Sequence, residues 1–208
     1  MNNITKIIGT LPLMFFYNKL NKELEMHQTK KIDMNSTALF HASSTVILGL
    51  QYLFKQKYEY LIQFNSGGYF LFDFYYILKE RKLNLLHGMY LYHHITGYLY
   101  MLLSSTKHYW PQVFLYSELS NIPSYLVYYS LKQDKLNKIK NYKSDKTKLL
   151  MKIQLAIYTI IRIFVLGYYG YKEIKNNKIN KQPVVYSTSI LYLFGCIWTI
   201  VMIKQNLK

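Results

Sequence analysis

The sequence predicts an all-α fold, a bundle of six helices that cross a membrane several times around a polar interior. Six predominantly apolar stretches are each about 20 residues long, the length that a helix needs to cross a bilayer. A few histidines, carboxylates and one arginine lie inside these stretches, where each needs a partner within the protein. The stretches are 36–54, 58–78, 83–105, 110–131, 150–171 and 184–203.

Composition supports a membrane protein and argues against a nucleic-acid-binding one. The chain has 208 residues, 51% of them hydrophobic, and a formal net charge of +16. Its lysines fall between the apolar stretches and do not form a stripe with interleaved aromatic residues, so no nucleic-acid partner is predicted. Basic connections beside membrane helices face anionic lipid instead. The single cysteine, Cys196, allows no disulfide within one chain.

Residues 1–35 form a separate N-terminal segment. Its apolar run, 7–17, is broken by Gly9 and Pro12 and is short for a membrane span. A shortened membrane helix and an interfacial anchor both fit this run, and a charged and polar linker, 18–35, follows. The main domain is predicted over 36–203, and a basic tail, 204–208, ends the chain.

The stretch 83–105 organises the domain. It contains no charged residue but three histidines, His87, His93 and His94. On a helix His87 and His94 share one face, and His93 lies about a quarter-turn away. A polar helix face within the hydrocarbon region of a membrane has to pack against other helices or line a cavity.

The basic residues also predict an orientation. Lysine and arginine are more than twice as frequent in the connections at one end of the six stretches as in those at the other. The positive-inside rule places the richer end, which includes the segment 132–147 and the C-terminus, in the cytoplasm.

Counting 1.5 Å per residue along each helix estimates the depth of the polar residues. Glu118 and Arg162 come to nearly the same level close to the midplane, next to His93 and His94. We therefore predict an ion pair between Glu118 and Arg162 with one of these histidines in reach. Three shallower groups would lie nearer the cytoplasmic end: His41, Asp73 and His87.

In these residues the chain resembles the TLC-domain family, which includes ceramide synthases and translocating-chain-associated membrane proteins. The resemblance covers about 36–203 and is carried by an ordered set of short pieces. They are Phe40-His41, Gly68-Tyr69-Phe70 with Asp73, His93-His94-Ile95-Thr96, Glu118-Leu119-Ser120-Asn121-Ile122-Pro123, and Arg162. The resemblance implies a six-helix barrel-like bundle with a central lipid cavity in the endoplasmic reticulum.

One departure from the family changes the functional expectation. Ceramide synthases carry a His-Asp-x-Ser-Asp string where this chain has Ser117-Glu118-Leu119-Ser120-Asn121. One acidic position is therefore neutral, and the leading histidine is a serine. The sequence is more similar to the small TLC proteins, which implies lipid binding or sensing in membrane homeostasis, with membrane lipids as partners and no cofactor.

The alternative is a lipid acyltransferase that takes acyl-CoA as co-substrate. His93 or His94 would act as general base or acyl-accepting nucleophile, oriented by Glu118 or Asp73. Arg162 would hold a phosphate or carboxylate in a bidentate manner. His87, His41 and Asn121 are the remaining candidates for lipid contact, and purely structural hydrogen bonds between helices remain the competing interpretation for the polar set. No metal site is predicted, because the histidine spacing does not fit the boxes of membrane di-iron enzymes.

Overall fold

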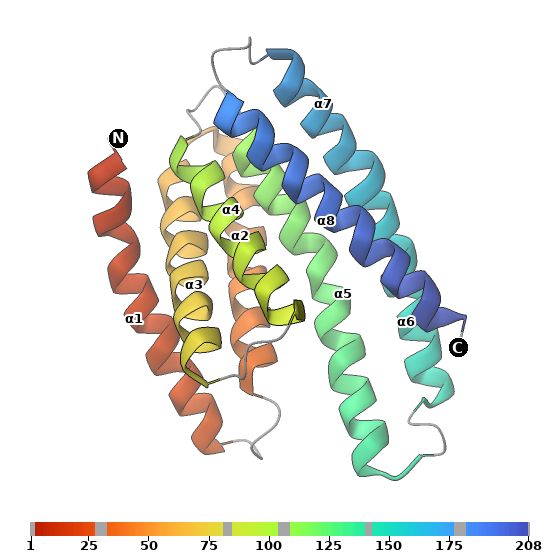
Figure 1. The fold of residues 1–208 in the computed structure, drawn as a ribbon. Coiled ribbons are helices and arrows are strands. Elements are labelled where there is room, and N and C mark those ends of the chain that lie inside the picture. The colour runs from red at the N-terminus through yellow and green to blue at the C-terminus, as the bar shows by residue number, and fades with distance from the viewer. Residues whose placement is uncertain are drawn as a thin grey trace.

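The computed structural model describes residues 3–27, 33–80, 85–103, 109–139, 143–176 and 182–207. Within these ranges the chain is helical and contains no strand. Long helices run up and down the bundle in Figure 1, so that the N-terminus lies at one end and the C-terminus toward the other. The helices are α1 (Asn3–His27), α2 (Asp33–Lys55), α3 (Glu59–Glu80), α4 (Leu85–Leu103), α5 (Trp110–Leu136), α6 (Asp145–Thr159), α7 (Leu166–Asn176) and α8 (Gln182–Asn206).

Each of the six predicted stretches corresponds to one helical rod. The fifth stretch is α6 and α7 joined without a break by a π-helical turn, Ile160–Val165. This rod begins at Asp145, earlier than the apolar stretch, because Ser144 caps it by accepting a hydrogen bond from the Thr147 N–H at 3.2 Å. A carboxylate in the first turn is favourable there, where the helix dipole is positive.

The N-terminal segment is a longer helix than its apolar run predicts. The helix α1 spans 25 residues, contains Pro12, and continues through the polar residues up to His27. It packs mainly against α3 and also against α2. Hydrogen bonds connect it to both helices, among them those from the Tyr17 hydroxyl to Asn65 Oδ1 at 2.6 Å and from the Thr37 hydroxyl to Asn21 Oδ1 at 3.0 Å. The segment is therefore part of the bundle.

Two glycines of α3 allow α1 to approach closely. A Cβ at Gly68 would lie 2.5 Å from Leu13 Cβ and 2.9 Å from the Leu13 backbone carbon, and one at Gly67 would lie 2.6 Å from Thr10 Cγ2. No side chain fits at such distances. Small residues of this kind bring helix backbones together in membranes.

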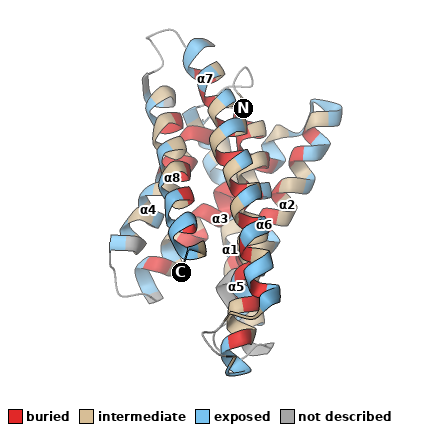
Figure 2. Ribbon diagram, turned by 90° about the vertical axis from the view of Figure 1, so that its right-hand side faces the viewer, coloured by how far each residue is buried: buried red, intermediate tan, exposed pale blue. Residues whose placement is uncertain are grey.

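The remaining helices close the bundle around one interior. Helix α2 packs against α5, α4 against α3 and α8, and the α6–α7 rod against α5 and α8. Figure 2 shows buried positions on the faces that meet and exposed ones along the outer faces and ends. The aromatic core includes Tyr17, Tyr69, Phe70, Phe72 and Phe114.

Three helices of the described chain are long and apolar enough to cross a membrane, judged by length and composition. They cover Ser36–Lys55, Asp145–Lys175 and Val185–Asn206. Their outer faces expose large apolar side chains such as Phe164, which is 67% exposed, and Leu193, which is 58% exposed. Polar residues meanwhile make up as much of the buried set as apolar ones do. The described surface therefore exposes many large apolar side chains, while the interior holds many polar ones.

Candidate functional site

A carboxylate–imidazole pair joins α3 to α4 in the interior. His94 Nδ1 lies 2.9 Å from Asp73 Oδ2, and both side chains are almost fully buried. The two atoms are within ion-pair distance, but the ring N–H is not aligned for a linear hydrogen bond. The His94 ring also stacks on Phe70, with the ring centroids 5.0 Å apart. Asp73 is therefore the carboxylate next to His94, and its role in orienting an imidazole remains a prediction.

His41 of α2 is held in the centre of a second polar cluster. Its Nε2 lies 3.2 Å from the hydroxyls of both Ser66 and Thr45, and its ring stacks on Tyr69 at 4.1 Å. Its Nδ1 lies 4.0 Å from Glu118 Oε2 and has no hydrogen-bond partner in the described parts of the chain. His41 therefore lies in the interior beside Glu118, although the sequence placed it at a shallower level.

The π-helical turn presents Arg162 to one face of α5. Its Nε donates to Ser120 Oγ at 2.8 Å, and its Nη2 donates to the Ser117 carbonyl and to Asn121 Oδ1, each at 3.0 Å. The acceptors lie at positions i, i+3 and i+4, so they form one face of the helix. Gly195 of α8 lies beside the arginine stem, and a Cβ there would be in ordinary van der Waals contact with it at 3.4 Å.

The predicted direct ion pair between Glu118 and Arg162 is wrong, because no oxygen of the carboxylate lies within ion-pair distance of the guanidinium. Asn121 joins the two groups instead. Its Oδ1 accepts from Arg162, and its Nδ2 donates to Glu118 Oε2 at 3.1 Å. The physical reason is rotation about α5, since Glu118 lies about 100° around the helix from Ser117 and so points toward α2. Depth along a helix does not specify this angle.

A small cavity lies between these groups and the apolar core. Its volume is about 40 Å³, which is room for only a few water molecules. Helices α3, α4, α5, α7 and α8 and the π-helical turn contribute to its wall. The polar part of the lining is His93, Ser117, Glu118, Arg162, Thr188 and Tyr192, and the apolar part is Phe70, Gly97, Val113, Phe114, Leu166 and Leu191.

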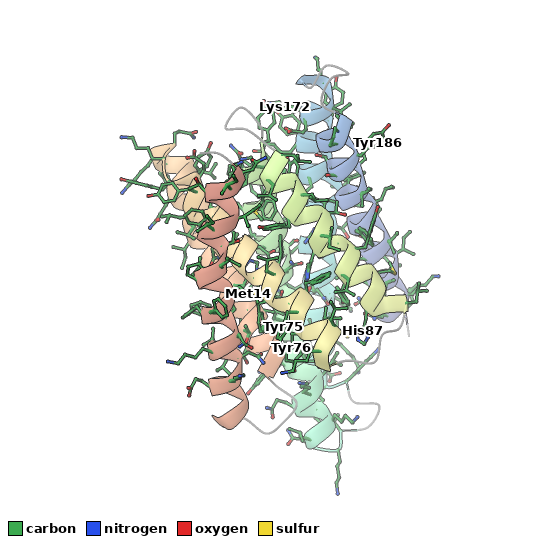
Figure 3. The ribbon with its side chains drawn as sticks, turned by 60° about the vertical axis from the view of Figure 1, so that its left-hand side comes forward. Met14, Tyr75, Tyr76, His87, Lys172 and Tyr186 are labelled. Carbon is green, nitrogen blue, oxygen red and sulfur yellow. The ribbon has the colours of Figure 1, made fainter. Side chains whose placement is uncertain are left out.

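The two neighbouring histidines have different surroundings. His93 lines the cavity and meets Phe194 of α8 edge to face at 5.6 Å, and its Nδ1 has no hydrogen-bond partner among the residues described. His94 does not line the cavity. His87 lies two turns earlier, toward the lower end of α4 in Figure 3, and also lies outside the cavity lining.

Sequence reasoning missed several members of the polar set. Ser117 and Ser120 accept hydrogen bonds from Arg162, and Tyr17, Asn65, Thr45 and Ser66 extend the network from α1 to His41. The spacing Ser117-x2-Ser120-Asn121 was the available signal, because it marks one polar face opposite the only arginine in any stretch. In the described ranges, no three His, Cys, Asp or Glu side chains are grouped so that they could hold a metal ion.

Comparisons with protein-family models, with curated proteins and with solved structures find no match for this chain.

Proposed function

We propose that the chain is a multi-pass membrane protein that binds the polar group of a lipid in its interior, as the resemblance to the small TLC proteins suggests. The observation that carries this proposal is the mixed lining of the cavity. His93, Glu118 and Arg162 supply hydrogen-bonding groups, and aromatic and aliphatic side chains form much of the rest. A lipid is the ligand class that combines a polar group with an apolar chain, and binding sites of this kind need few polar groups.

The membrane part of the proposal extends from the three sufficiently apolar helices to their neighbours. Helices α3, α4 and α5 are 22, 19 and 27 residues long, and about 20 residues span a bilayer. Their polar residues reduce their mean hydropathy, but Asp73, His93 and Glu118 turn inward. In this arrangement all six predicted stretches cross the membrane, in the endoplasmic reticulum by analogy with the TLC family.

Lipid binding requires the bundle to open, because about 40 Å³ does not accommodate an acyl chain. We propose that α4 and α8 separate, since both line the cavity and meet mainly through side-chain rings. Tyr92 lies 6.1 Å from Phe194, and Tyr90 lies 5.5 Å from Trp198. Gly97 of α4 lies on the cavity wall and leaves space beside Phe70.

The test is lipid retention by the purified protein, read by native mass spectrometry after extraction in a mild detergent. We expect the wild-type chain to retain a lipid and His93→Ala and Glu118→Gln to retain several-fold less. The matched control is His87→Ala, on the same helix but outside the cavity lining. Equal retention by His93→Ala, Glu118→Gln and His87→Ala, or no retained lipid in the wild type, would refute the proposed interior site.

A second candidate function, acyl transfer, is favoured by the pairing of His94 with Asp73. The imidazole would take the proton of a lipid hydroxyl or amine, and that oxygen or nitrogen would attack the thioester carbon of acyl-CoA. The carbon–sulfur bond would then break, and the thiolate would receive the proton. The geometry supports this candidate less well, since the imidazole next to Asp73 is not the one that lines the cavity.

Incubation with acyl-CoA separates the two functions. An enzyme would release CoA thiol and form acylated lipid, or would gain the mass of an acyl group on His93 or His94, and His94→Ala would abolish the reaction. A lipid-binding protein would show neither product nor mass shift across acyl chain lengths.

A further inference from the structure

A groove lies on the outer surface between α6 and the C-terminal end of α8. It is lined by Lys152, Leu155, Ala156, Thr159, Ile160 and Asn206. Its volume is about 450 Å³, compared with about 40 Å³ for the interior cavity. A groove of this size falls in the range of small-molecule binding sites.

The groove has a polar end and an apolar length. The four lining residues of α6 are spaced i, i+3, i+4 and i+7, and Ile160, the first residue of the π-helical turn, follows them, so that these side chains form one stripe along the rod. Lys152 and Asn206 lie at the lysine-rich end of the bundle, and the stripe continues through Ala156 to Ile160, which is 57% exposed.

Lys152 marks the boundary between the basic and the apolar parts of this rod. The next charged residue toward the C-terminus is Arg162, which turns into the interior. Lys148, one turn earlier, is paired with Asp145 at 2.9 Å. Lys152 has no carboxylate within ion-pair distance in the described chain, and Lys146, Lys148 and Lys204 add positive charge at the same end.

We propose that this groove binds one anionic phospholipid. Its phosphate lies on the Lys152 ammonium beside the Asn206 amide, and an acyl chain runs along Leu155, Ala156 and Ile160. Charge complementarity selects the occupant, because the lysine-rich end is the end proposed to face the cytoplasm, whose leaflet carries the anionic lipids. The proposal rests on the membrane placement of α6 and is independent of the interior cavity.

The experiment compares lipid retention by the full chain in nanodiscs of phosphatidylcholine with and without phosphatidylserine. Lys152→Gln removes the charge at the groove, and Ala156→Trp fills the groove. The matched controls are Lys146→Gln and Ile153→Trp, which make the same changes at residues of α6 outside the groove lining. Retained lipid is counted by native mass spectrometry after transfer to detergent.

We expect the wild type to retain phosphatidylserine in preference to phosphatidylcholine. Lys152→Gln should lower phosphatidylserine occupancy about fivefold, the factor expected for one lysine near an anionic surface. Ala156→Trp should lower it at least as much, and both controls should retain the wild-type level. Equal losses in Lys152→Gln and Lys146→Gln, or no preference for phosphatidylserine, would overturn the proposal. His93→Ala leaves this site intact, which separates its failure from that of the proposed function.

Discussion

His94 Nδ1 lies 2.9 Å from Asp73 Oδ2, and this pair joins α4 to α3 in the interior of the bundle. The other carboxylate oxygen, Asp73 Oδ1, is buried and has no hydrogen-bond partner in the described ranges. Each group is therefore the main polar partner of the other. Removing either one leaves a buried polar group without compensation.

The first prediction concerns this pair. We expect Asp73→Leu and His94→Leu each to destabilise the protein, and the double variant to be more stable than the sum of the single losses predicts. The coupling energy should be about 0.5–3 kcal/mol, as for residues in contact. Chemical unfolding in detergent measures it, and strict additivity of the two losses would show that the groups do not interact.

The second prediction follows from the bridging role of Asn121. Asn121→Leu removes the hydrogen bond that Asn121 accepts from Arg162 and the one that it donates to Glu118, and we expect a loss of about 1–3 kcal/mol in the free energy of unfolding. Glu118→Gln keeps an acceptor for Asn121 Nδ2 and should cost less. If Glu118→Gln were the more destabilising of the two, a direct charge interaction with Arg162 would dominate.

The third prediction compares two glycines. Gly68→Ala places a Cβ 2.5 Å from Leu13 Cβ, so α1 has to move away from α3, at a cost of about 1–3 kcal/mol for overpacking. Gly88→Ala is the control, because nothing lies within 4 Å of its added Cβ. Alanine is the better helix former, so Gly88→Ala should be neutral or stabilising. Thermal unfolding in detergent distinguishes the two outcomes.

The fourth prediction concerns the hairpin between α5 and α6. The Thr147 hydroxyl and the Ser144 N–H donate to Asp134 Oδ2 and lower the pKa of this carboxyl below its ordinary value of 3.8. This carboxylate therefore stabilises the fold above pH 3.8, and the stabilisation is lost as the pH falls through the lower pKa of the folded state.

Asp134→Asn should remove this dependence. We expect the variant to be less stable than the wild type at neutral pH and the difference to shrink in acid. Unfolding measured between pH 7 and about pH 2 tests the sign of the effect. A difference that grows on acidification would contradict the prediction.

The fifth prediction tests the proposed orientation. In a background with Cys196→Ser, Lys138→Cys and Tyr186→Cys place single thiols at opposite ends of the bundle; Figure 3 shows Tyr186 at the end away from the hairpin. We expect a membrane-impermeant maleimide to label Lys138→Cys in sealed microsomes and Tyr186→Cys only after permeabilisation. The reverse pattern would invert the orientation.

The six apolar stretches were predictable because each one is long and predominantly apolar, and most of the lysines fall in the connections between them. The N-terminal helix was only partly predictable. Its polar residues Tyr17 and Asn21 have partners on α2 and α3, and such partners do not appear in the hydropathy of α1 itself. Tertiary contacts therefore extend this helix beyond its apolar run.

The candidate site was predictable only in part, because the cavity lining includes three of the predicted residues but not His87 or His94, and the pairing differs. The depth estimate correctly grouped Glu118 and Arg162, and His93 lines the same cavity. The depth estimate does not specify the direction of a side chain around its helix axis. It therefore predicted a direct ion pair between Glu118 and Arg162, whereas Asn121 joins the two groups. The π-helical turn also escaped prediction, because the residues Ile160–Val165 carry no proline or glycine to mark it.

The π-helical turn between α6 and α7 determines the direction in which the side chains of α7 point relative to those of α6. A π turn holds about one more residue per turn than an α turn does, so winding the same residues Ile160–Val165 as a regular α-helix would rotate α7 by about 100° relative to α6. Glu173, which is fully buried and accepts a hydrogen bond from the Tyr109 N–H at 3.2 Å, would swing outward. One helical rod therefore directs Arg162 toward α5 and Glu173 toward Tyr109 because Ile160–Val165 adopt the π conformation.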